Sequence, residues 1–208
     1  EEARINDLEN LKIIEENISK SKRYSSFPKL AATLTDCDKA AINIVDETTQ
    51  HCKVNFGMDA MENMMTKEIP RELSVCAHVL NNDTGSLVIN DLTKDDRTKH
   101  VFELNNPIIN NTFPRFYAGS PIITSNGYIL GSFCVFNSKP KSLDSSKVEG
   151  LRMLADQFID LYESTRSDYQ KGIKDESQSQ EKIKGEYYSS STILFCDFVG
   201  FTKKTEKM

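Results

Sequence analysis

The sequence has no long apolar run and no surplus of positive charge, and each absence excludes a class of protein. No apolar stretch approaches the roughly 20 residues that a membrane-spanning helix needs, and the first residues lack a signal-peptide pattern. The net charge is −5, from 26 basic and 31 acidic residues mixed along the chain, so no basic stripe is available to bind nucleic acid. We therefore expect a cytoplasmic protein with neither a membrane nor a nucleic acid as partner. Because the sequence begins Glu-Glu-Ala-Arg without Met, we allow for a domain upstream.

The chain has few cysteines, and their spacing matches no known disulfide or metal-binding motif. The count is five, an odd number, and no two cysteines are spaced C-x-x-C. Three of them lie in apolar patterns, where a thiol behaves as a small hydrophobic group, so we expect a reducing compartment. The histidines have no metal-ligand spacing to the cysteines. The cysteines are Cys37, Cys52, Cys76, Cys134 and Cys196, and the histidines are His51, His78 and His100.

The stretch from Phe113 to Phe136 is predicted to form two long strands joined at Asn126-Gly127. That dipeptide tolerates the positive φ angles of a type I′ hairpin turn. Both faces of the second strand are largely apolar, so we predict a central strand covered on both sides. Gly119 and Gly131 are expected where a neighbouring group packs closely against the sheet. The pattern favours a buried hairpin over the floor of a ligand site.

Two helices and a hairpin are predicted before this stretch. A narrow apolar stripe indicates an amphipathic helix at the N-terminus, formed by Ile5, Leu8, Leu11, Ile14 and Ile18. Ser25, Ser26 and Pro28 are expected to open a second helix, which ends between Thr35 and Asp38. Residues 40–45 and 51–56 alternate or are rich in branched side chains, which predicts an antiparallel hairpin.

The middle of the chain is predicted to be irregular. Residues 57–67 contain four methionines, and this segment either covers a pocket or lies on the core as an ordinary loop, which we favour. Pro70 is expected to precede a helix over residues 73–80, and residues 86–90 a strand. The polar segment 91–111, with a short apolar helix around Val101, Phe102 and Leu104, is long enough to suggest a functional loop. Within it, Asp91 and Arg97 are candidates for a salt bridge.

A helix is predicted after the central hairpin, capped by Asp144 or Ser145. Its apolar residues form another narrow stripe, made of Val148, Leu151, Leu154, Phe158 and Leu161. Two such helices bracketing one domain suit a parallel homodimer, but both helices could equally cover the sheet. Residues 167–191 are polar and low in aliphatic side chains, so we expect a linker there.

Three segments resemble a GAF domain: SVCAHVL at 74–80, LVINDLTKDDR at 87–97 and RFYAGSPIITSNGYILGSFCVF at 115–136. The resemblance implies an α+β fold, an α/β sandwich whose central antiparallel sheet is flanked by helices. We divide the chain into an N-terminal helix (1–22), the GAF core (23–142), a signalling helix (143–170), a linker (171–191) and a further domain's beginning (192–208). GAF domains bind many ligands or none, and the segment at 91–111 commonly lines their cavity. Our candidate pocket residues are Cys76, Asp91, Arg97, Phe102, Arg115, Tyr117, Ser120 and Phe133.

The identity of a ligand stays open. The Asn-Lys…Phe…Asp-Glu signature of GAF domains that bind cyclic nucleotides is missing. Cys76 and His78 are spaced Cys-Ala-His, whereas bilin-binding relatives have adjacent Cys-His, so Cys76 is better explained as a core residue. Nothing supports haem ligation. A reductase of the methionine sulfoxide type needs paired reactive cysteines, and only Cys76 and Cys134 are candidates, both in buried patterns. An empty pocket in a dimerisation module remains the rival hypothesis.

The segment TILFCDFVGFT at 192–202 resembles the opening of a class III adenylate or guanylate cyclase domain. A strand that ends in an aspartate can present a carboxylate to Mg²⁺, and the following turn can face phosphate oxygens. The resemblance implies two metal ions, Mg²⁺ or Mn²⁺, in the full-length enzyme. Asp197 corresponds to the first metal-binding aspartate, Phe198 to a backbone carbonyl ligand and Gly200 to the turn glycine.

Since the other cyclase residues are absent, we expect no catalysis from this chain alone. Our prediction is a homodimeric GAF sensor that binds a small ligand and regulates a C-terminal cyclase. The alternative is a non-catalytic ligand-binding or dimerisation module.

Overall fold

The chain divides into two units, Glu1–Asp168 and Tyr169–Met208. The computed structural model describes residues 1–82, 85–99, 102 and 113–182, with side chains as far as Ser167. The first unit holds every strand described here, whereas the second is described only as the backbone of a helix that ends at Lys182. The predicted short helix around Val101, Phe102 and Leu104 and the predicted cyclase-like segment at 192–208 fall almost wholly outside the described residues.

One antiparallel sheet organises the first unit, with the strand order β3-β2-β1-β6-β5-β4. β6 therefore lies between β1 and β5 and is hydrogen-bonded on both edges, as its two apolar faces predict. The α+β class with a central antiparallel sheet is confirmed, and so are the hairpin of β1 with β2 and the short strand β4. The strands are β1 Lys39–Val45, β2 Thr49–Phe56, β3 Glu68–Pro70, β4 Leu87–Ile89, β5 Phe116–Ile123 and β6 Ile129–Asn137.

The turn between β5 and β6 differs from the type I′ turn that we predict. Gly127 has a φ of 84°, but Asn126 is not among the residues with positive φ, and a type I′ turn needs both. The Gly127 N–H donates to the Thr124 carbonyl at 2.8 Å, and the Thr124 N–H donates to the Tyr128 carbonyl at 3.0 Å. This is the longer hairpin loop in which a turn is followed by a left-handed glycine.

Two glycines allow close contacts within the sheet, as we predict. A Cβ atom on Gly131 would lie 2.0 Å from the backbone oxygen of Asn43 on the neighbouring strand. A Cβ atom on Gly119 would lie 2.3 Å from the Tyr117 hydroxyl and 2.5 Å from the Ser132 hydroxyl. Gly131 therefore permits the pairing of β6 with β1, and Gly119 leaves space for polar side chains on one face.

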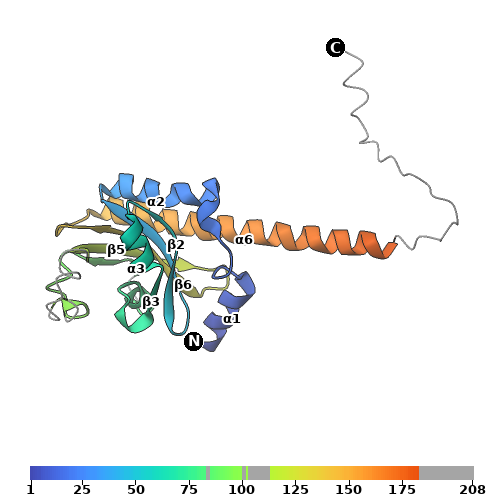
Figure 1. Ribbon diagram of the computed structural model, residues 1–208, viewed down its shortest axis with the longest axis horizontal. Coiled ribbons are helices and arrows are strands. Elements are labelled where there is room, and N and C mark those ends of the chain that lie inside the picture. The colour runs from blue at the N-terminus through green and yellow to red at the C-terminus, as the bar shows by residue number, and fades with distance from the viewer. Residues whose placement is uncertain (83–84, 100–101, 103–112, 183–208) are drawn as a thin grey trace, which may run out of the picture. The chain divides into compact units, whose positions relative to one another are not determined.

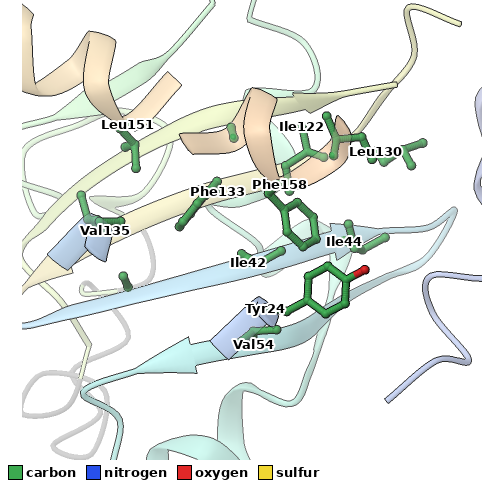
Figure 2. Packing of buried hydrophobic residues seen from close by; sticks show 14 of the residues in the cluster. Tyr24, Ile42, Ile44, Val54, Ile122, Leu130, Phe133, Val135, Leu151 and Phe158 are labelled. Atoms are coloured by element: carbon green, nitrogen blue, oxygen red, sulfur yellow. The ribbon is translucent and has the colours of Figure 1, made fainter. Parts of the chain in front are cut away.

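Two long helices cover one face of the sheet (Figure 1). They are α2, Lys22–Thr35, and the part of α6, Ser145–Lys182, that belongs to the first unit. Tyr24 and Phe27 of α2 contact the Phe158 ring at centroid distances of 5.9 Å and 6.0 Å. Figure 2 shows Tyr24 and Phe158 directed toward Ile42 and Ile44 of β1. This first cluster is the larger core, and burial of its side chains supplies most of the apolar stabilisation.

The boundaries of these helices correct two predictions. α2 begins at Lys22, so Pro28 lies inside the helix instead of opening it. α6 starts as predicted, because the Asp144 carboxylate accepts a hydrogen bond from the Lys147 N–H at 2.9 Å. It then continues to Lys182, so residues 171–182, which we predict as linker, are helical.

The apolar stripe of α6 faces the sheet. Leu151, Phe158 and Tyr162 are at most 1% exposed within one chain. The structure thus supports the interpretation in which the helix covers the sheet, while leaving its outer side available. No helix in the described part of the chain is both long and apolar enough to cross a membrane.

The N-terminal helix α1 is Glu2–Leu11, so the helix that we predict over residues 1–22 ends early, at Lys12 with a left-handed φ of 53°, and Ile18 lies in a 3₁₀ turn, Ile18–Lys20. α1 is fixed by polar contacts as well as by Leu8. Arg4 donates to the Val45 carbonyl at 2.6 Å, and Asp7 accepts from the Thr124 hydroxyl at 2.7 Å. Both charged side chains are buried, at 7% and 8% exposure. A buried charge is tolerated only with such partners, so α1 is bound to turns at one end of the sheet.

The turn between β1 and β2 is organised by the Asp46 carboxylate. It accepts hydrogen bonds from the N–H groups of Thr48 and Thr49 at 2.8 Å and 2.6 Å, and it lies 2.7 Å from Nε2 of His51. Burial opposes ionisation of Asp46, but the hydrogen bonds from His51 and from the two N–H groups outweigh it and lower the Asp46 pKa.

The segment that we predict as a helix over residues 73–80 forms two short 3₁₀ helices instead, η2 Arg71–Leu73 and η3 Cys76–Val79. Ser74 between them is extended, at φ −85° and ψ 120°. Its hydroxyl donates to Gln50 Oε1 at 2.5 Å and accepts from the Ala77 N–H at 3.0 Å. The local bond from the Ala77 N–H and the long-range bond to Gln50 both compete with a continuous helix through Ser74, which explains the break.

The methionine-rich segment is helical, which corrects the loop that we favour. α3, Ala60–Thr66, begins with a capping box between Asp59 and Glu62. Met64 is 75% exposed, and Met61 and Met65 are also exposed. Met58 alone of the four packs against the second core cluster, so the segment does not lie on the core as a whole.

Candidate functional site

The second core cluster lies on the face of the sheet opposite α2 and α6. It joins η3, β4 and the loop after β4 to the strands β1, β5 and β6. At its centre are five buried polar or sulfur-containing side chains that come from four different elements. We call them the thiol cluster: Asn43, Cys76, Tyr117, Ser132 and Cys134.

The thiol cluster is closely connected. The sulfur atoms of Cys76 and Cys134 lie 3.8 Å apart. The Asn43 amide nitrogen is 3.3 Å from each sulfur. The Tyr117 hydroxyl donates to the Cys76 sulfur at 3.3 Å and lies 2.9 Å from the Ser132 hydroxyl. In the described part of the chain, the Asn43 Oδ1 atom is buried and accepts no hydrogen bond.

These contacts distinguish the two thiols chemically. The hydrogen bonds to the Cys76 sulfur, from Cys134 first and then from Tyr117 and Asn43, lower the pKa of Cys76 although burial opposes this. Burial raises the pKa of Cys134 and the pKa of Tyr117, because each would become an anion in an apolar environment. Hydrogen bonding therefore favours the thiolate form of Cys76, whereas burial favours the protonated form of Cys134.

Three of the predicted pocket residues lie at or near this cluster. Cys76 and Tyr117 belong to it, and Tyr117 reaches it because Gly119 has no side chain there. Phe102 packs against the second core cluster and meets Phe113 edge-on at a centroid distance of 5.5 Å. Cys76, Tyr117 and Phe102 thus belong to, or pack against, the same core cluster.

Asp91 and Arg115 form a separate polar group at the end of β5. The Asp91 carboxylate lies 3.6 Å from the Arg115 Nε atom. A hydrogen bond from the Thr93 hydroxyl at 2.7 Å is the main cause that lowers the Asp91 pKa. Arg97 pairs with Asp95 at 2.7 Å, so the predicted salt bridge between Asp91 and Arg97 is wrong. Asp91 and Asp95 thus each accept a hydrogen bond from a residue two positions further along the loop, Thr93 and Arg97 respectively.

A surface hollow of about 690 Å³ adjoins Asp91. Its wall comes from the end of β4, the loop after it and the segment before α6, which bring together carboxylates and lysines. The residues are Val88, Ile89, Asn90, Asp91, Lys94, Asp95, Pro140, Lys141 and Ser142.

Ser120 and Phe133 do not belong to the site, which corrects the prediction. Side chains alternate between the two faces of a strand, so Ser120 cannot share a face with Tyr117. The Ser120 hydroxyl pairs with the Ser86 hydroxyl at 2.7 Å, and Phe133 lies in the first cluster under α2 and α6. Ser120 and Phe133 thus lie on the face of the sheet that α2 and α6 cover, whereas Tyr117 lies on the other face.

Sequence reasoning missed Asn43 and Ser132 and did not place Cys134 in the pocket. The available signal was an amide or hydroxyl inside the apolar strands KAAINIV and ILGSFCVFN. Buried polar side chains need partners, so a lone polar residue in such a strand indicates a polar neighbour across the sheet. The metal-ligand candidates Asp197 and Phe198 lie outside the described residues. Among the described residues, no group of three or more His, Cys, Asp or Glu side chains is placed to hold a metal ion.

Comparison with known proteins identifies the family. Residues 27–159 match the family model described as GAF domain, which is more than half of the chain. This chain therefore belongs to the GAF domain family. A curated relative is the cyclic di-GMP phosphodiesterase PA2567 of Pseudomonas aeruginosa, 33% identical over 104 residues. The match covers 49% of this chain but only 16% of that protein, so it concerns a small part of the relative.

Solved structures agree on the fold. The GAF domain of an Acinetobacter phosphoenolpyruvate-protein phosphotransferase has a TM-score of 0.55 at 14% identity, over 79% of this chain and 98% of that one. The PixJ GAF domain of Thermosynechococcus elongatus, in its blue-light-absorbing form, has a TM-score of 0.50 at 12% identity, over 90% and 99%. The free methionine-R-sulfoxide reductase of Neisseria meningitidis has a TM-score of 0.55 at 14% identity, over 76% and 87%. At such identities the likeness concerns the fold alone.

Proposed function

We propose that this chain is the regulatory GAF sensor of an enzyme that makes a nucleotide second messenger, a class III adenylate or guanylate cyclase. A small ligand binds on the face that carries the second core cluster, and the signal passes to the C-terminal catalytic domain through α6. The support for a sensor is the set of contacts that join the central hairpin to α6. The support for a cyclase is the segment at 192–202, which includes Asp197.

The contacts that carry the proposal lie at the turn between β5 and β6. The Ser125 N–H donates to the two carboxylate oxygens of Glu163 on α6 at 3.1 Å and 3.3 Å. Asp7 of α1 accepts from Thr124 and from Asn126 of the same turn, both at 2.7 Å. The hairpin also carries Tyr117, on the ligand face. A shift of the hairpin on binding is therefore transmitted to both bracketing helices.

The proposed assembly is a homodimer through the outer side of the two long helices. Leu30 and Leu34 of α2 are 56% and 40% exposed, and Met153 of α6 is 58% exposed. The Leu34 side chain lies against Gly150 of α6, so the apolar groups of the two helices are adjacent. A parallel dimer on this surface brings two copies of α6 together, as a cyclase with active sites between two catalytic domains requires.

The catalytic half needs divalent metal. In the cyclase hypothesis, the Asp197 carboxylate and the Phe198 carbonyl contribute to binding Mg²⁺ or Mn²⁺, hard cations that prefer oxygen ligands. A second candidate output is hydrolysis of cyclic di-GMP, favoured by the 33% identity to a phosphodiesterase of that substrate. In both hypotheses the GAF domain regulates a catalytic domain that makes or hydrolyses a nucleotide second messenger. A dimerisation module with an empty pocket is the rival to both.

The decisive experiment uses the protein extended past Met208 as its gene encodes it. We would assay it for cyclic AMP and cyclic GMP formation from ATP and GTP with Mg²⁺ or Mn²⁺, and for hydrolysis of cyclic di-GMP. Cyclase activity that disappears in Asp197→Ala supports the proposal. Hydrolysis of cyclic di-GMP without cyclase activity would refute the cyclase hypothesis and support the phosphodiesterase hypothesis. A folded dimer with neither activity would contradict both hypotheses.

Two further measurements test the sensor. Thermal unfolding with about 1 mM cyclic AMP, cyclic GMP or cyclic di-GMP should show a stabilisation of RT ln(1 + [L]/Kd) if one of them binds. In the active enzyme, Glu163→Ala should reduce the response to that ligand more than Glu149→Ala, a control on the same helix whose carboxylate pairs only with exposed Arg152 among the described contacts. Equal responses in the two variants would refute transmission through Glu163.

A further inference from the structure

We propose that Cys76 and Cys134 form a site at which hydrogen peroxide oxidises the GAF domain to an internal disulfide. The inference does not depend on the cyclase output. It starts from the geometry: two thiols from η3 and β6 meet at 3.8 Å in a buried site with three hydrogen-bonding side chains. Of the four cysteines in the described residues, these two make the only sulfur–sulfur contact that the structure shows.

The environment distinguishes this pair from the other described cysteines. Burial raises the Cys52 pKa to about 11, and burial is also the main cause that raises the Cys37 pKa. Neither sulfur receives hydrogen bonds from both an amide and a phenol, as the Cys76 sulfur does. Because the thiolate is the reactive form, Cys76 is the nucleophile of the pair.

A second observation is a buried acceptor beside the two thiols that has no hydrogen-bond donor within the part of the chain that the structure describes. The Asn43 side chain is 3% exposed, and its Oδ1 atom has no partner among the described residues. Its amide nitrogen already contacts both sulfurs at 3.3 Å, so the free oxygen lies beside the thiols. A buried acceptor without a donor is costly, and an O–H group of a bound peroxide can supply that donor.

The reaction has two balanced steps. First, the Cys76 thiolate attacks one oxygen of hydrogen peroxide, the O–O bond breaks, and the leaving hydroxide takes a proton to become water, so that Cys76 becomes a sulfenic acid. Second, the sulfur of Cys134 attacks the sulfenic sulfur, its proton is transferred to the leaving hydroxyl, and a second water leaves. The two thiols together lose two electrons, which the peroxide accepts. A thiol reductant reverses the product by exchange.

The disulfide changes the site. The sulfurs must approach from 3.8 Å to the bond length of about 2.05 Å. Cys134 is fixed in the central strand, so η3, a short 3₁₀ helix, makes most of the movement. Because the Cys76 side chain is only 4% exposed, oxidation depends on local opening of this segment and is expected to be slower than that of an exposed thiol.

The test is peptide mapping of the purified chain after treatment with hydrogen peroxide and alkylation of the remaining thiols. We expect a Cys76–Cys134 linked peptide that disappears after dithiothreitol. A urea-unfolded sample treated in the same way shows that the peptides are detectable and the thiols oxidisable. Linkage of other cysteines in the folded protein, irreversible oxidation of Cys76 without linkage, or no reaction where the unfolded sample is fully oxidised would overturn the proposal.

Variants assign the two roles. In Cys134→Ser, dimedone should trap a sulfenic acid at Cys76, whereas in Cys76→Ser the thiol of Cys134 should stay unmodified. Tyr117→Phe, which removes one donor to the Cys76 sulfur, should slow linkage relative to wild type. Cys52→Ser is the matched control and should leave the linkage unchanged. If Cys134→Ser and Cys76→Ser react alike, the assignment of nucleophile and resolving thiol is wrong.

Discussion

Replacing Phe158 with alanine tests whether α6 is packed on the sheet as the structure places it. The Phe158 side chain is fully buried. Its ring lies 5.9 Å from Tyr24, 6.0 Å from Phe27 and 6.3 Å from Tyr162, measured between ring centroids. It therefore connects α2 to α6 above β1, and its removal leaves a cavity between the two helices (Figure 2).

The expected loss is large compared with the total stability. Truncating a buried phenylalanine to alanine typically costs about 3–5 kcal/mol, and the three ring contacts place Phe158→Ala toward the upper part of that range. Folded domains are stable by about 5–15 kcal/mol, so the variant should unfold at a much lower urea concentration. Urea titration followed by circular dichroism gives the free energy of unfolding and the slope m.

Two other variants make the measurement decisive. Asp160→Ala, at an exposed position of the same helix, should change the stability by no more than about 0.5 kcal/mol. Phe158→Leu should recover part of the loss because it fills part of the cavity. If Phe158→Ala and Asp160→Ala lose similar small amounts of stability with an unchanged m, then α6 does not pack against the sheet as described.

Two further predictions concern the sheet and one of its turns. Gly131→Ala should lower the melting temperature strongly, because the new Cβ would lie 2.0 Å from the Asn43 carbonyl oxygen. Gly150→Ala should change it only slightly, since its Cβ would meet only the end of the Leu34 side chain. Equal melting temperatures of the two variants would contradict the register of β6 on β1. Asp46→Asn should lower the melting temperature at pH 7, and the difference from wild type should shrink as the pH falls below about 4. The reason is that a carboxylate whose pKa is lowered in the folded protein stabilises the fold at pH values above its pKa in the unfolded chain, about 3.9, and loses this effect when it is protonated. A difference that stays constant down to pH 2 would show that the Asp46 charge contributes nothing.

The elements that could be predicted from the sequence are those with a simple period or a strong local signal. The two apolar faces of residues 129–136 predict a strand with neighbours on both sides, and β6 has them. The glycine at 131 predicts a close approach, which the Asn43 backbone makes. Asp144 predicts the start of α6. Each of these follows from residues within one segment.

The elements that could not be predicted depend on contacts between segments. Ser74 interrupts the expected helix because its hydroxyl donates a hydrogen bond to Gln50 of β2, a partner that no local sequence pattern indicates. Arg4 is buried because the carbonyl of Val45 accepts from it. For the site, residue type alone suggested Cys76 and Tyr117, but the assignment of Ser120 to the same pocket required knowing which face each residue occupies. Pairing register, and not composition, decides that question.

The strand order has a consequence for how the chain is made. β1 and β6, the first and last strands in the described part of the chain, pair antiparallel from Lys39 opposite Phe136 to Ile44 opposite Gly131. During synthesis the ribosome therefore releases β1 and β2 long before the partner that completes the middle of the sheet. Contacts this distant in sequence slow folding, because the loop between them must close first. Until then one edge of β1 has no strand beside it, so this interval is the period in which a nascent chain is most exposed to pairing with another copy.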